Sequence, residues 1–85
     1  MGTDEGAVDR SFLGEGRYAN YFEVGHNLFE FVLDFGQGGH EGEPTRIYVR
    51  IITTPECAAT LSRLLEDALG KYRQVFGPIQ GDENS

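Results

Sequence analysis

The sequence has too little cysteine to hold a small fold together covalently. Its 85 residues include one cysteine, Cys57, so no disulfide can form within a single chain. A lone cysteine fits a reducing compartment, and the acidic N-terminal segment lacks the apolar stretch of a secretory signal. We therefore expect a cytoplasmic protein that is stabilised by packing.

Long apolar runs are also missing. A helix that crosses a bilayer needs about 20 consecutive apolar residues, whereas the longest apolar stretches here are interrupted by Glu30, Asp34 and Arg50. The sequence excludes a membrane-spanning helix of this kind. We expect a soluble protein without a membrane partner.

Positive charge is scarce. The chain carries 7 Lys and Arg against 14 Asp and Glu, a net charge of −7. Residues 1–17 contribute −2, residues 18–79 contribute −3, and residues 80–85 contribute −2. The two acidic ends are predicted to be disordered tails, which leaves one domain over residues 18–79. Binding to a phosphate backbone normally requires clustered positive charge, so the composition disfavours nucleic acid as a partner.

Few residues offer catalytic or metal chemistry. His26 falls in a predicted turn and His40 in a glycine-rich loop, and no motif spacing connects them. His40, Glu41 and Glu43 fall short of the four nitrogen or sulfur ligands of structural zinc. Cys57 lies on the apolar stripe of a predicted helix, which favours a buried small side chain over a reactive thiol. We predict no catalytic residue, metal or cofactor, and we do not expect an enzyme.

The middle of the chain alternates in side-chain character with the period of two that is typical of β-strands. Such segments cover residues 17–25, 28–35 and 46–53. Residues 25–27 offer Gly and Asn for a tight hairpin, and residues 36–45 are rich enough in glycine to form a loop. We predict a three-stranded antiparallel meander.

Charges are predicted to set the register of the second and third strands. If these strands are neighbours, Glu30 and Asp34 face Arg46 and Arg50, and such cross-strand pairs contribute about 0.2–1 kcal/mol each. A slip of one residue would place apolar side chains beside the arginines. The other faces of these strands and one stripe of the following helix form the predicted core: Phe29, Phe31, Leu33, Phe35, Ile47, Val49, Ile51, Leu61, Leu65 and Ala68.

A helix start follows the third strand. Thr54 is a suitable N-cap, and Pro55 suits the first helical position, where its missing N–H is not needed. Gly77 followed by Pro78 is typical of a helix end. The sequence predicts a helix from Pro55 to near Phe76.

The apolar surface of this helix is wider than packing on one sheet face requires. A stripe of about 100° suffices for that packing, and a single helix covers only one face of the sheet. Mid-helix Gly70 is either a tolerated exposed glycine or the site where another backbone approaches closely. Surplus apolar surface usually marks an interface. We predict a homodimer whose contacts include Tyr21, Leu28, Val32, Leu64, Tyr72, Val75 and Phe76.

Four short motifs occur in order along the predicted domain: YAN at 18–20, EFVLDF at 30–35, TP at 54–55, and FGPI at 76–79 after Tyr72. With these motifs the chain resembles the small bacterial proteins known as domain of unknown function 3467. The resemblance covers residues 18–79. It implies a compact domain of strands and a helix, and it implies no catalytic activity.

We therefore expect an α+β fold, in which a three-stranded antiparallel meander precedes one C-terminal α-helix packed on the sheet. The expected function is that of a non-enzymatic, homodimeric module for protein interaction, either structural or as an adaptor, in a larger bacterial assembly with an unidentified protein partner. The alternative is a small nucleic-acid-associated regulator. It would use Arg46 and Arg50 on a sheet face, helped by Tyr48 and by three helix bases: Arg63, Lys71 and Arg73.

Overall fold

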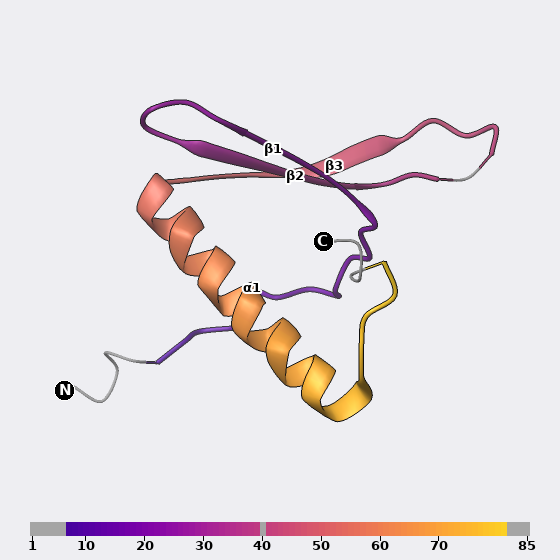
Figure 1. Cartoon of the computed structure of the whole chain (residues 1–85). Coiled ribbons are helices and arrows are strands. Elements are labelled where there is room, and N and C mark those ends of the chain that lie inside the picture. Colours follow the sequence, from indigo (N-terminus) through magenta and orange to yellow (C-terminus); the bar gives the residue numbers. More distant parts are fainter. Residues whose placement is uncertain (1–6, 40, 82–85) are drawn as a thin grey trace.

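The computed structural model describes residues 7–39 and 41–81, which form three strands followed by one helix (Figure 1). The elements are β1 (Tyr21–His26), β2 (Phe31–Gln37), β3 (Arg46–Thr53) and α1 (Pro55–Phe76). The strands pair antiparallel in the order β1-β2-β3. The predicted α+β meander with one C-terminal helix is confirmed.

The turn between β1 and β2 lies further along the chain than the sequence suggested. The side-chain oxygen Oδ1 of Asn27 accepts hydrogen bonds from the backbone N–H of Phe29 at 2.8 Å and of Glu30 at 2.9 Å. These bonds close the turn over residues 27–30, so β2 begins at Phe31. Leu28 and Phe29 occupy the tip, where they are 81% and 75% exposed. Phe29, predicted as a core residue, therefore lies outside the sheet.

The YAN motif has a structural role at the start of β1. The side chain of Asn20 donates to the carbonyl of Gly38 at 3.0 Å and accepts from its N–H at 2.9 Å. The side-chain amide of Gln37 also donates to the carbonyl of Tyr18 at 3.0 Å. The residues before β1 are thereby tied to the end of β2.

The pairing of β2 with β3 aligns Asp34 with Arg50. A register shift follows between Phe35 and Gly36. Glu30 precedes β2, and Arg46 pairs with Gln37 at the opposite end of the strand. Of the predicted meeting of Glu30 and Asp34 with Arg46 and Arg50, only the contact of Asp34 with Arg50 is formed, because Glu30 and Arg46 lie at opposite ends of the paired strands in this register.

The helix begins and ends at the predicted caps. The hydroxyl Oγ1 of Thr54 accepts from the N–H of Cys57 at 3.1 Å, and Pro55 is the first helical residue. Gly77 has φ +90°, and its N–H donates to the carbonyl of Arg73 at 2.9 Å. The left-handed conformation at Gly77 strongly favours glycine.

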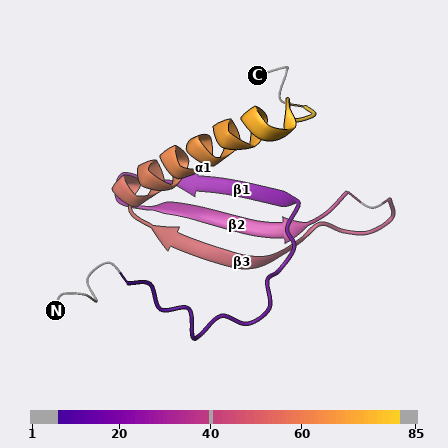
Figure 2. The same cartoon turned by 90° about the horizontal axis from the view of Figure 1, so that it is seen from below.

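The helix does not lie flat on the sheet. Figure 2 shows that α1 crosses the sheet only at the end where β3 leads into it and then runs out past β1. The radius of gyration is 16.4 Å, compared with about 12 Å for a compact domain of this length. Much of the inner sheet face is consequently left without a covering layer.

No apolar side chain is buried anywhere in the described part of the chain. Of the ten residues predicted as core, four on the sheet are half-buried: Phe31, Leu33, Phe35 and Val49. The other six are exposed: Phe29, Ile47, Ile51, Leu61, Leu65 and Ala68. The core prediction assumed that the helix would close over the whole sheet face, and the divergence of α1 prevents this within one chain.

Candidate functional site

The most pronounced apolar surface is a groove between the inner face of the sheet and the first half of α1. It has a volume of about 380 Å³. The rings of Phe22 and Phe35 meet edge to face across β1 and β2, with centroids 5.7 Å apart. Phe22 remains 58% exposed and Leu65 55% exposed. We call this surface the apolar groove and define it by Phe22, Val24, Leu33, Phe35, Leu61 and Leu65.

A second hollow of about 350 Å³ continues the groove along the helix. It shares four walls with the first hollow and adds Phe31, Ala58 and Leu69. Among the described residues, Leu69 is the last helix residue that lines either hollow. The groove is therefore floored by strands along its whole length but walled by only the first part of α1.

The second part of α1 continues the same apolar stripe beyond the sheet. Tyr72 and Phe76 follow Leu65 and Leu69 at helical steps of three and four, so they share a face of the helix. The rings of Tyr72 and Phe76 lie 4.9 Å apart. Their exposures are 48% and 70%, and Val75 is 72% exposed. We call Tyr72, Val75 and Phe76 the helix-end cluster.

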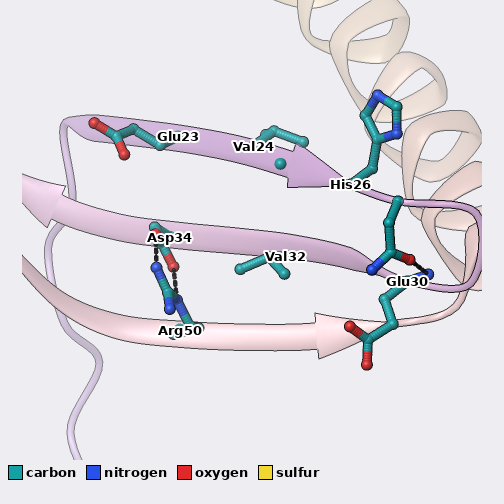
Figure 3. Close-up of a pocket in the computed structure, with 9 residues that line it drawn as sticks. Glu23, Val24, His26, Glu30, Val32, Asp34 and Arg50 are labelled. Atoms are coloured by element: carbon teal, nitrogen blue, oxygen red, sulfur yellow. Dashed lines mark hydrogen bonds and ion pairs between the residues drawn. The ribbon is translucent and has the colours of Figure 1, made fainter.

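The outer face of the sheet carries a charged pair at its centre. Arg50 donates from Nε to Oδ1 of Asp34 and from Nη2 to Oδ2, both at 2.8 Å, and the two side chains meet across β2 and β3 (Figure 3). Asp34 is only 6% exposed. The hydrogen bonds from Arg50 hold the pKa of the Asp34 carboxyl below its usual value, against the opposing effect of desolvation.

The rest of the outer face is mixed. Glu23, Val32 and Glu30 surround the charged pair in a hollow of about 370 Å³. The hydroxyl of Tyr21 donates to Oε2 of Glu23 at 2.6 Å, and this bond raises the pKa of the tyrosine. Tyr21 and Val32, both predicted as interface residues, are half-buried here. This face offers a smaller apolar surface than the groove does.

One contact, between Arg17 and Tyr48, was not predicted from the sequence. The guanidinium carbon of Arg17 lies 3.8 Å from the ring centroid of Tyr48 on β3, a cation–π geometry. The hydroxyl of Tyr48 is buried and has no hydrogen-bond partner within the described residues. Arg17 stands at the start of the alternating segment over residues 17–25, and alternation alone does not place its side chain over Tyr48.

Within residues 7–39 and 41–81, the candidates for reactive chemistry belong to no group of three or more side chains that could hold a metal ion. Cys57 is exposed, so the prediction of a buried side chain is wrong, because Cys57 lies beside Glu56 and Arg63 and not among the helix residues that line the groove. Hydrogen bonds from Thr54 and Thr53 lower the pKa of its thiol. His26 stacks on Phe31 with ring centroids 5.3 Å apart. His40, considered above with Glu41 and Glu43, is outside the described residues.

The bases of the nucleic-acid alternative are partly engaged by carboxylates. Arg50 is held by Asp34, and the ammonium of Lys71 lies 3.1 Å from Oδ2 of Asp67 one helical turn away. The guanidinium of Arg63 donates to the hydroxyl of Thr60 at 3.2 Å. Arg46 lies at the end of β3 where the glycine-rich loop joins it. Two of these bases, Arg50 and Lys71, are thus paired with carboxylates.

The fold and the groove together define a small α+β domain with an open apolar surface between its sheet and its helix. The chain belongs to the family described as protein of unknown function (DUF3467), whose family model matches residues 8–81. The match includes residues 8–17, which belong to the predicted disordered N-terminal tail. No curated protein and no solved structure matches the chain. Within the described residues, no helix has the length and apolar character needed to cross a membrane.

Proposed function

We propose that this protein is a non-enzymatic interaction module that folds as a homodimer and serves as a structural or adaptor subunit in a larger bacterial assembly in the cytoplasm. The observation that carries the proposal is the lack of any buried apolar side chain among the described residues of the single chain. Burial of apolar surface is the dominant favourable term in folding. A second subunit supplies the missing half of the core.

Size supports the same conclusion. Domains of this length have marginal cores and usually rely on disulfides, a metal or a partner subunit. One cysteine excludes an internal disulfide. A symmetric partner with the same exposed surface covers two grooves with one contact.

The adaptor role rests on a second exposed apolar feature. Leu28 and Phe29 stand at the tip of the β1–β2 turn, while the groove lies on the inner sheet face. A dimer built on the groove leaves a hydrophobic tip on each subunit for a protein partner. The engagement of Arg50 by Asp34 and of Lys71 by Asp67 favours this role over nucleic-acid binding.

Sedimentation equilibrium of the full chain tests the dimer. We expect a mass of twice 9.4 kDa at micromolar concentration and a thermal midpoint that rises with concentration, because association stabilises the folded state by mass action. A monomer that unfolds cooperatively at a concentration-independent temperature would contradict the proposal.

Affinity purification of the tagged chain from its native cytoplasm tests the adaptor role. We expect one protein partner to be recovered with the wild type and lost with Leu28→Ser/Phe29→Ser, while the dimer mass of that variant stays unchanged. Phe12→Ser is the matched control, since Phe12 is also exposed, at 93%, but lies in the segment before β1. Recovery of the same proteins with the wild type and the turn variant would contradict the adaptor role.

A further inference from the structure

Two apolar surfaces of the described chain lack a covering layer, and each is suited to bury the other, because one is a sheet face and the other is the end of a helix. One is the inner sheet face along β2 and β3, and the other is the helix-end cluster. We infer that the inner sheet face of each subunit is the binding site for the helix-end cluster of a second copy of this chain, so that two subunits exchange the ends of their helices. This inference rests on the homodimer proposed above and specifies its contact.

The sheet side of this contact is the apolar inner face of β2 and β3. Leu33 and Phe35 line the groove from β2, and their β3 neighbours in the register are Ile51 and Val49. Ile51 is 46% exposed. Figure 2 shows α1 lying over the β1 side of the sheet, away from most of β3. The uncovered strip therefore runs beside the helix of the same chain, where a second helix can lie.

The helix side of the contact is the helix-end cluster, which is already formed in the single chain. Tyr72 and Phe76 are already in ring contact, and they continue the stripe on which Leu61 and Leu65 meet the sheet. The second half of α1, which carries the cluster, diverges from its own sheet (Figure 1). The same stripe thus lines the groove beside its own sheet with its first half and is free to contact a partner's sheet with its second half.

The exposed area matches what a dimer of this kind needs. The chain exposes 7607 Å², whereas a compact monomer of 9.4 kDa exposes about 5,000 Å². Part of the excess belongs to the extended segment before β1. The difference as a whole is well above the roughly 800 Å² per partner that a specific interface buries.

Other occupants fit less well. The cluster cannot reach its own sheet, because it belongs to one continuous helix from Pro55 to Phe76. The segment before β1 has exposed apolar residues, including Phe12 at 93%. In Figure 2 this segment passes beyond β3, at the opposite edge of the sheet from α1. A symmetric exchange of helix ends covers both open surfaces of each subunit at once.

Photo-cross-linking of the full chain tests the exchange. The photoreactive aromatic p-benzoylphenylalanine at position 76 keeps an aromatic ring there, and mixing isotopically heavy and light chains separates contacts between copies from contacts within one copy. We expect heavy-to-light cross-links from position 76 to β2 or β3. Cross-links within one copy, cross-links to residues 7–17 of the other copy, or no cross-links in a verified dimer would each overturn the exchange. The last two outcomes leave the homodimer intact.

A matched pair of aromatic truncations gives an independent readout. We expect Phe76→Ala to raise the dimer dissociation constant at least about tenfold, as truncation of a buried interface aromatic does. Phe12→Ala removes an equal side chain from outside the contact and should change the constant less than about twofold. The reverse ranking would overturn the exchange in favour of the N-terminal segment. If Phe76→Ala is unfolded, the cross-linking result decides.

Discussion

Arg50 donates two parallel hydrogen bonds to Asp34, from Nε to Oδ1 and from Nη2 to Oδ2, each 2.8 Å long. The pair joins the central strand to β3 at directly opposed positions. A bidentate arginine–carboxylate contact adds geometric specificity to its energy. In a sheet without a closed apolar core, this pair favours the observed register of β2 and β3.

This contact makes stability depend on pH in the acid range. Arg50 lowers the pKa of Asp34 from its ordinary value of 3.8, so the folded state favours the charged carboxylate. The resulting stabilisation is complete above pH 3.8 and is lost as the pH falls through the lower folded-state pKa. We expect Asp34→Asn to be less stable than wild type at neutral pH and to lose less stability on acidification, measured by urea unfolding.

Glu30→Gln is the control for this prediction. Glu30 has no ion pair within the described residues and sits in the β1–β2 turn, so its removal should preserve the acid dependence of the wild type. Identical pH profiles for Asp34→Asn and wild type would show that the pair does not influence folding.

Gly36 is the position in β2 where a side chain cannot be accommodated. It is buried at the register shift, and an added Cβ would lie 3.0 Å from the Cα of Ile47 and closer to the carbonyl oxygen of Arg46. Both are backbone atoms that cannot rotate away. We expect Gly36→Ala to reduce the free energy of unfolding by about 1–3 kcal/mol, as overpacking does, measured by urea unfolding at fixed protein concentration.

Gly25→Ala is the matched control in β1. A Cβ at Gly25 would meet no atom within 4 Å. We expect this variant to be as stable as wild type or slightly more stable. Equal destabilisation by both alanines would mean that the close approach at Gly36 is not the cause.

Much of the fold could be predicted from the sequence, because its signals are local. The caps at Thr54 and Gly77 depend on nearest neighbours, and the period of two in the strands depends on side-chain alternation. The sequence predicted the turn at residues 25–27, because GHN contains suitable turn residues. In the structure the side chain of Asn27 closes the turn over residues 27–30 instead. Local propensity identified the elements but did not fix the boundary.

The candidate site could be predicted only in outline. The alternation identified which faces of β2 and β3 are apolar, and the width of the helix stripe indicated a surplus surface. The angle between α1 and the sheet has no local signal, so the apolar groove and the exposure of Leu65 were not predicted. The predicted surplus lay on the outer sheet face and on α1, whereas the structure also leaves a large apolar surface on the inner sheet face.

Thr54 provides a test of the helix start. Its hydroxyl satisfies the N–H of Cys57, and loss of such an N-cap typically costs about 1 kcal/mol. We expect Thr54→Ala to lower the free energy of unfolding by that amount. Ser62→Ala, on an exposed position of the same helix, should have no destabilising effect because alanine has the higher helix propensity. A loss with Ser62→Ala equal to that with Thr54→Ala would exclude capping as the cause.

Gly70 distinguishes the two interpretations of a glycine in the middle of α1. Within the described chain, a Cβ at Gly70 would meet no atom within 4 Å, and its φ is not in the left-handed region. If the position also faces solvent in the dimer, Gly70→Ala should raise the free energy of unfolding by about 0.5–1 kcal/mol, since alanine favours the helix. We expect this gain at every protein concentration. A weaker dimer in sedimentation would instead place a partner backbone against Gly70 and would put the crossing point of the two helices at that residue.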